Sequence, residues 1–94
     1  MKALNYFLDF GDTIEEDPRI GPTHISLYHA LLYEYIKGAC RLPIAINRRR
    51  VLQKAKICRK TYNKRMGELQ AYGYIDYVPS NDPSVRSRVY LNRL

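Results

Sequence analysis

The sequence predicts a small, mostly helical α+β domain in which three helices precede a C-terminal β-hairpin, with a short helical extension in front. Apolar residues recur at helical spacing within residues 23–38 and 59–72. Two segments rich in β-branched and aromatic residues, 74–78 and 85–91, flank the turn-forming sequence PSNDPS. With 94 residues, 46% of them hydrophobic, the chain is long enough for one modest core and too apolar for a disordered basic tail.

The N-terminal extension is predicted to comprise residues 1–22. Residues 1–10 have the spacing of a short helix, with three apolar side chains on one face: Leu4, Phe7 and Leu8. Residues 11–22 (GDTIEEDPRIGP) are acidic and are punctuated by Gly and Pro, which is typical of a connector.

The main domain is predicted to span residues 23–94 and to begin with a helix. Thr23 is a suitable N-cap for this helix, and Gly38 supplies its end. Residues 41–46 (RLPIAI) then form a short extended piece, because Pro and the β-branched residues disfavour helix there.

Two further helices follow, joined by a tight turn. Asn47 is the expected N-cap of a helix over residues 48–55, and residues 56–58 form the turn. The next helix covers residues 59–72 and ends at Gly73. Alternation in the hairpin then puts Ser87, Val89 and Leu91 on one face and Arg86, Arg88 and Tyr90 on the other.

The helix over residues 59–72 has two distinct faces. At 100° per residue, Tyr62, Met66 and Leu69 share the stripe that should face the core. Gly67 lies on the outward side, where a mid-helix glycine costs about 1 kcal/mol relative to alanine. Close approach of a groove, crowding against another helix, and neutral drift are all open explanations. The outward side and its flanks also carry Lys60, Thr61, Asn63, Lys64 and Ala71.

Charge is concentrated around these two helices. The segment from Lys37 to Arg65 contains eleven Lys and Arg and no Asp or Glu, whereas the rest of the chain has five basic and nine acidic residues. The net +7 is therefore +11 in this segment and −4 elsewhere. Such a basic concentration is the electrostatic footprint of a protein that meets phosphates, and a simple solvated face is the alternative.

Both helix starts in this segment oppose their own dipoles. A helix N-terminus favours acidic residues by about 0.3–1 kcal/mol per charge, yet these helices begin with Arg48, Arg49 and Arg50 and with Arg59 and Lys60. A bound phosphate would relieve both ends, because helix N-termini are ready anion sites. The alternative is that the long arginine side chains extend into solvent at little cost.

The segment VLQKAKICRKTYNKRMGELQAYGYI resembles the winged helix-turn-helix superfamily. Leu52, Ala55 and Ile57 stand where that family packs its first helix and turn, whereas Cys58 replaces the usual serine cap. The segments GPTHISLYHALL and GYIDYVPS are also similar to small winged-helix proteins of Bacteroidetes-type bacteria, which are described as transcriptional regulators, some associated with mobile elements.

The resemblance implies roles for particular residues. The helix over residues 59–72 would be the recognition helix in the major groove, and residues 74–91 would form a wing on the adjacent backbone. Lys60, Asn63 and Lys64 would reach base edges, since Asn pairs with adenine and Lys reaches guanine acceptors. Backbone phosphates would be held by Arg48, Arg49, Arg50, Arg59, Thr61, Arg86 and Arg88.

The sequence thus favours sequence-specific binding of double-stranded DNA by a small bacterial transcriptional regulator located in the cytoplasm with the nucleoid. One alternative is a winged-helix module that docks on a protein. Another is an architectural, replication or excision accessory factor of a mobile element. An outward face around Lys60 that the chain itself covered would favour the protein-docking alternative.

Other functional classes receive little support. His24 and His29 point about 140° apart on a helix, and Cys40 and Cys58 lack zinc-site spacing, so we expect no metal, no cofactor and no enzyme activity. Both histidines are expected at or near the helix surface, and both cysteines as free thiols. No stretch of about 18 apolar residues occurs, so we expect no membrane span. The first ten residues make a poor signal peptide.

The helix over residues 23–38 is apolar around about half of its circumference, more than one core requires. One stripe contains Ile25, Tyr28, Leu32 and Ile36, and the second contains Leu27, Leu31 and Tyr35. Residues 1–10 are expected to cover the second stripe within one chain or in a homodimer. We favour the homodimer, formed through residues 1–10 and 23–38, because a two-fold dimer matches a palindromic DNA site.

Overall fold

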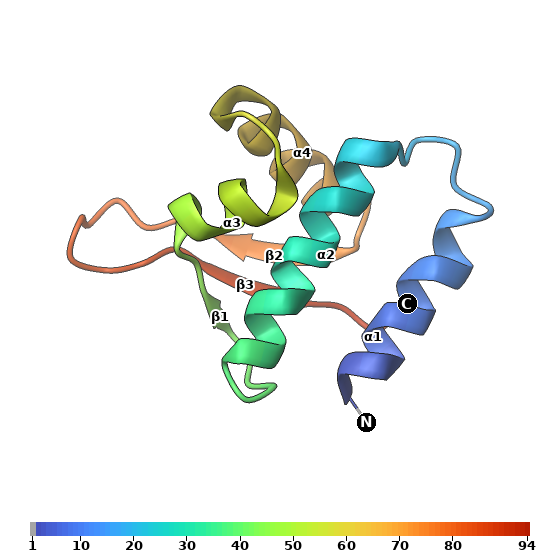
Figure 1. Cartoon of the computed structure of the whole chain (residues 1–94), viewed down its shortest axis with the longest axis horizontal. Coiled ribbons are helices and arrows are strands. Elements are labelled where there is room, and N and C mark those ends of the chain that lie inside the picture. The colour runs from blue at the N-terminus through green and yellow to red at the C-terminus, as the bar shows by residue number, and fades with distance from the viewer. Residues whose placement is uncertain (1) are drawn as a thin grey trace.

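The predicted order of elements is confirmed in a computed structural model that describes residues 2–94. Over this range the chain forms four helices and a three-stranded antiparallel sheet, and it is mostly helical (Figure 1). In chain order the elements are α1 (Lys2–Ile14), α2 (Pro22–Lys37), β1 (Ile44–Ala45), α3 (Arg48–Ala55), α4 (Arg59–Ala71), β2 (Ile75–Val78) and β3 (Arg88–Leu91).

The first helix is longer than predicted. α1 continues through Gly11 to Ile14, so that only residues 15–21 connect it to α2. Phe10 is fully buried and Ile14 packs against the core, and this tertiary packing outweighs the low helix propensity of Gly11.

The start of α2 also differs from the prediction. Gly21 is the N-cap and Pro22 takes the first helical position, where its missing N–H costs nothing. The predicted cap, Thr23, instead accepts a hydrogen bond of 2.8 Å from Arg65 Nε. The backbone N–H of Gly21 donates to His24 Nδ1 at 3.0 Å. The His24 side chain thus supplies an acceptor for an N–H at the helix start, which has none within the helix.

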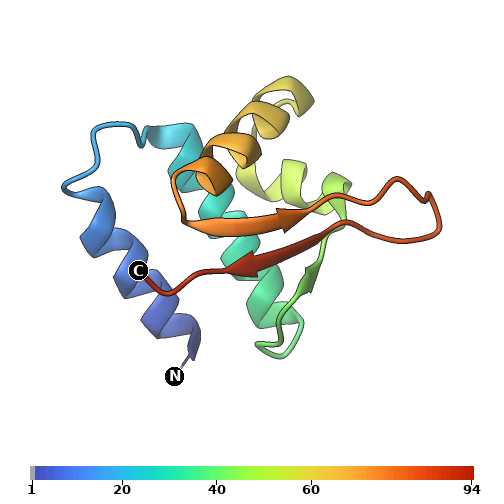
Figure 2. The same ribbon diagram turned by 180° about the vertical axis from the view of Figure 1, so that it is seen from behind.

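β3 is the central strand of the sheet, in the order β1-β3-β2. Val89 pairs with Ile44 on one side and with Tyr77 on the other. Val89 and Leu91 are buried while Arg88 and Tyr90 are exposed, which confirms the predicted alternation. The hairpin loop, residues 79–87, projects from the end of the molecule opposite α1 (Figures 1 and 2).

α2 lies at the centre of the core, between α1 on one side and α3 and α4 on the other (Figures 1 and 2). Leu27, Leu31 and Tyr35 of its second stripe are fully buried within the chain. Tyr6 of α1 meets Tyr35 of this stripe edge to face, with ring centroids 5.4 Å apart, and Phe10 stacks on Tyr28 of the first stripe at 3.8 Å. The stripe that prompted the dimer prediction is therefore covered by the chain itself.

The face of α1 that does the covering is not the predicted one. Leu4, Phe7 and Leu8 are 47–50% exposed. The inward positions are instead Ala3, Tyr6, Phe10 and Ile14, which recur at helical spacing and contact the core. Because α1 carries large apolar side chains on both sides, its sequence does not decide which side faces the core.

His24 is more buried than predicted, with 4% of its surface exposed. Because Nδ1 accepts from Gly21, the proton lies on Nε2, which donates to Glu68 Oε1 at 2.8 Å. Arg65 also donates to Glu68, at 2.6 Å, so the start of α2 is fastened to α4 by a polar cluster of three side chains. His29 is exposed, in agreement with the prediction.

Candidate nucleic-acid interface

The outward face of α4 is open. Tyr62, Met66 and Leu69 are buried as predicted, which turns Lys60, Asn63 and Lys64 toward solvent, and all three are exposed. An alanine side chain at Gly67 would meet nothing within 4 Å in the described chain, so helix crowding does not account for this glycine. The three residues predicted to contact bases thus lie together on one accessible helix face.

The start of α4 has no side-chain cap. Cys58 occupies the N-cap position without bonding to a helix N–H. Its Sγ lies 3.2 Å from Thr61 Oγ1, and this hydrogen bond lowers the pKa of the thiol below its usual range. Arg59 is exposed, while Thr61 is half-buried with its hydroxyl already engaged by Cys58. Of the two predicted phosphate contacts here, Arg59 is the more accessible.

The start of α3 is capped as predicted, since Asn47 Oδ1 accepts from the Arg50 N–H at 3.2 Å. Arg48, Arg49 and Arg50 are all exposed. The Arg50 guanidinium lies 3.2 Å from a Glu34 carboxylate oxygen, so its charge is partly neutralised within the chain. Arg48 and Arg49 form no ion pair with any carboxylate among residues 2–94.

Arg86 of the hairpin loop borders two hollows that also contain arginines of α3. The first, of about 220 Å³, lies between Arg48, Arg86 and the rings of Tyr62 and Tyr77. The second, of about 300 Å³, is bordered by Arg50 and Arg86. Arg48 and Arg86, which are nearly forty positions apart in sequence, thus lie on one surface. Tyr62 of α4 lines the same hollow. Arg49, Arg59 and Arg88 are exposed but line neither hollow.

Sequence reasoning did not single out Arg41 or the hydroxyl of Tyr62, and both residues line these hollows. Arg41 lines the second hollow, and only its place before β1 in the basic segment gave a signal for it. The Tyr62 hydroxyl is buried, lacks a hydrogen-bond partner within residues 2–94, and has a pKa raised by burial to about 12. Helical spacing identified Tyr62 as a core residue, but spacing does not tell whether its hydroxyl has a hydrogen-bond partner.

Acidic groups reduce the charge of this surface at two points. Asp82 lines the first hollow, although its carboxylate is engaged by the backbone and hydroxyl of Ser84. Glu34 borders the second hollow and pairs with Arg50. The positive charge that no carboxylate of residues 2–94 pairs with therefore lies with Arg41, Arg48, Arg49, Arg86 and the exposed basic residues of α4.

Other kinds of site find no support in the described part of the chain. No cluster of three or more His, Cys, Asp or Glu in residues 2–94 is placed to hold a metal ion. Within the same range, no helix has the length and apolar character needed to cross a membrane. Cys40 and Cys58 are both free. Comparisons with family models, with curated proteins and with solved structures found no match to this chain.

Proposed function

We propose that this chain is a winged helix-turn-helix domain that binds double-stranded DNA sequence-specifically and acts as a transcriptional regulator. The tight turn between α3 and α4 and the hairpin that follows are the parts such a domain requires. Within this proposal α4 enters the major groove and the hairpin loop, as the wing, meets the adjacent backbone.

The convergence of Arg48 and Arg86 on one hollow, which Tyr62 of α4 also lines, carries the proposal. A winged helix needs base-reading side chains on one helix and phosphate contacts from neighbouring elements. Lys60, Asn63 and Lys64 supply the first, and the two arginines supply the second. A helix whose outward face served only solubility would not need basic residues from a distant loop at its flank.

Positioning and readout are assigned to different residues. Asn63 is suited to adenine, whose N6 and N7 match an amide in a bidentate pair, and Lys60 and Lys64 are suited to guanine acceptors. Arg48, Arg49, Arg59 and Arg86 hold phosphates, and Arg50, Thr61 and Arg88 make weaker contacts with the backbone because of their partners or positions.

Selection of bound sequences from a random duplex pool tests the proposal. Wild-type protein should enrich a defined motif. Asn63→Ala and Lys64→Ala should each reduce discrimination between that motif and scrambled DNA by about 1–3 kcal/mol. Arg49→Ala, the matched control, should weaken both DNAs alike. Enrichment of no motif would refute sequence-specific binding, and unchanged discrimination in both α4 variants would refute its assignment to this helix.

We also propose that the exposed apolar face of α1 pairs with the same face of a second copy. Leu4, Phe7 and Leu8 lie together on it, and large exposed apolar groups of this kind mark interaction surfaces. Antiparallel packing of two such helices about a two-fold axis aligns their dipoles favourably.

A further inference from the structure

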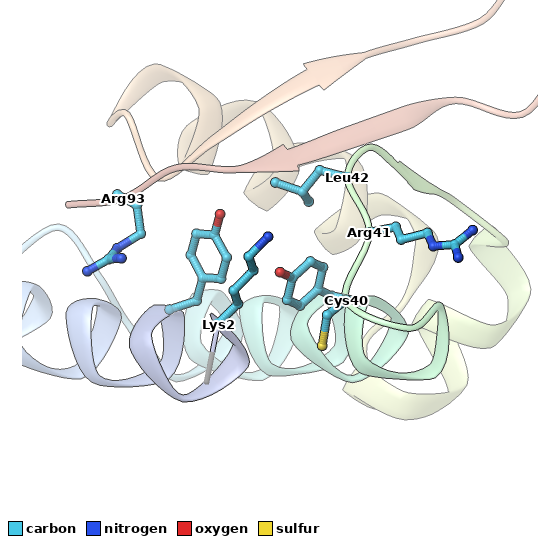
Figure 3. Close-up of a pocket in the computed structure, with 7 residues that line it drawn as sticks. Lys2, Cys40, Arg41, Leu42 and Arg93 are labelled. Atoms are coloured by element: carbon cyan, nitrogen blue, oxygen red, sulfur yellow. The ribbon is translucent and has the colours of Figure 1, made fainter.

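A pocket of about 540 Å³ lies at the opposite end of α2 from the contacts with α4 (Figure 3). His24, near the start of α2, bonds to α4, whereas Tyr35, about 16 Å further along the helix, lines this pocket. Its walls come from α1, the end of α2, the loop that follows α2 and the C-terminal tail: Lys2, Tyr6, Tyr35, Cys40, Arg41, Leu42 and Arg93. Its volume lies within the range of small-molecule sites.

The described residues that line the pocket include three with cationic side chains and none with a carboxylate. Arg93 is compensated, because it pairs with Asp9 of α1. Lys2 and Arg41 form no ion pair with a carboxylate of residues 2–94. In Figure 3 the Lys2 ammonium points into the space between α1 and the loop after α2, so one uncompensated charge is directed at the pocket.

Tyr35 adds a hydroxyl to the same lining. Its side chain is almost wholly buried, but its hydroxyl is not one of the fully enclosed, unpaired hydroxyls of the described residues, which are those of Tyr28 and Tyr62. A hydroxyl that forms no hydrogen bond with another described residue can donate to a ligand in the pocket. Burial, with Tyr6 and Cys40 nearby, raises the pKa of this phenol, which therefore remains protonated and able to donate at neutral pH.

The remaining lining is apolar. The ring of Tyr6 meets that of Tyr35 edge to face, with centroids 5.4 Å apart, and Leu42 lies across from them. Such a wall suits an aromatic or aliphatic body, while Lys2 and the Tyr35 hydroxyl suit an anionic head group.

We propose that this pocket binds a small organic anion, a carboxylate or phosphate monoester carried on an aromatic or aliphatic body. Lys2 supplies the charge, the Tyr35 hydroxyl donates a hydrogen bond to the head group, and Tyr6 and Leu42 contact the body. The Arg41 guanidinium extends away from the pocket in Figure 3, toward the second hollow that Arg41 also lines. This site is separate from the α4 face, so its occupancy is measurable without DNA.

Titrations of the full chain with phenyl phosphate and benzoate, followed by amide chemical shifts, test the proposal. We expect saturable shifts at residues 2–6, 35 and 40–42 with at least one of the two, and much weaker binding of neutral benzyl alcohol. Tyr35→Phe and Lys2→Met should each weaken binding by about tenfold, because each removes a bond to a charged group.

Tyr28→Phe is the matched control. The Tyr28 hydroxyl is buried and unpartnered among the described residues and does not line this pocket, so its removal should leave the affinity unchanged. Lys2 is exposed, so Lys2→Met tests the site even if Tyr35→Phe disturbs packing. Absence of saturable shifts with both anions would overturn the proposal, as would equal affinity for benzyl alcohol or wild-type affinity in Lys2→Met. None of these outcomes bears on DNA binding.

Discussion

Gly67 is the residue whose identity the fold explains least. It sits inside α4, is exposed, and has open space where a side chain would be. The fold alone would be more stable with alanine here. Close approach of a DNA groove, which the proposed function supplies, is a reason for a residue without a side chain.

We therefore expect Gly67→Ala to have opposite effects on stability and on binding. The free energy of unfolding should rise by about 0.5–1 kcal/mol, because alanine is the better helix former, and affinity for duplex DNA should fall. Urea denaturation and fluorescence anisotropy measure the two effects. Gly11→Ala is the control for helix stabilisation, since Gly11 lies inside α1 with equally open space, and it should raise the free energy of unfolding by a similar amount. Undiminished DNA affinity in Gly67→Ala would contradict the groove explanation.

Sequence reasoning at the scale of single residues succeeded where the cause is local. Asn47 was identified as a cap because its partner, the Arg50 N–H, is three residues away. Thr23 was misassigned because its hydroxyl bonds to Arg65, and His24 was misplaced because it bonds to Glu68. These partners lie more than forty positions along the chain, beyond the reach of local patterns.

Ion pairs and hydrogen bonds to carboxylates fasten the elements to one another. Asp9 joins α1 to the C-terminal tail through Arg93. Asp17 accepts from Arg19 and, at 2.7 Å, from the Tyr74 hydroxyl, which ties the connector before α2 to the start of β2. Glu68 joins α4 to α2. The hydrogen bonds from Arg93, from Arg19 and from Arg65 hold the pKa values of these three carboxyls below their usual range.

Stability should consequently fall in acid. A carboxyl with a lowered folded-state pKa contributes stability above its unfolded pKa of about 4 and loses it as the pH falls through the folded value. We expect urea midpoints to stay level from pH 7 to about pH 5 and then to decrease toward pH 2. Asp17→Asn should flatten this decrease, whereas Asp12→Asn, at a residue without an ion pair among residues 2–94, should not. A midpoint independent of pH below 5 would contradict this assignment.

At the scale of elements, the sequence predicted the positions of the helices and strands more accurately than it predicted their packing and pairing. Periodicity and Asn47 placed α3 and α4 to within a residue. The extended piece containing Ile44 was predicted, but its pairing with Val89 was not, because strand partners are chosen by the whole fold. α1 has apolar residues on two sides, so which side faces inward was decided by Phe10 and its fit against Tyr28.

At the scale of the whole molecule, the basic surface and the exposed face of α1 lie at opposite ends (Figures 1 and 2). A dimer through α1 would therefore leave both α4 helices free and double the number of phosphate contacts on one DNA. The apolar stripe of α2 no longer argues for this dimer, because the chain covers it. The exposed side chains of Leu4, Phe7 and Leu8 are the reason to expect it.

Light scattering coupled to size exclusion tests this arrangement. We expect a mass near two chains for the wild type and near one chain for Leu4→Ser/Leu8→Ser, because both substitutions remove apolar area from the proposed interface. Val85→Ser, at a hairpin-loop residue with a similar exposed fraction of 49%, should stay dimeric. Point substitutions are preferable to deletion of residues 1–18, which would uncover Tyr28. A wild-type mass near one chain at every concentration would rule out the dimer.

The dependence of duplex DNA affinity on salt tests the central claim most directly. If about five to eight basic residues contact phosphates, the logarithm of the binding constant should fall with the logarithm of salt concentration at a slope of roughly −4 to −7. Arg48→Ala/Arg86→Ala should make the slope less steep by roughly 2, because two of those contacts are lost. Lys2→Ala, which removes a charge at the other end of the molecule, should leave it unchanged. A flat titration, an unaltered slope in the double variant, or equal affinity for heparin would contradict DNA binding through this surface.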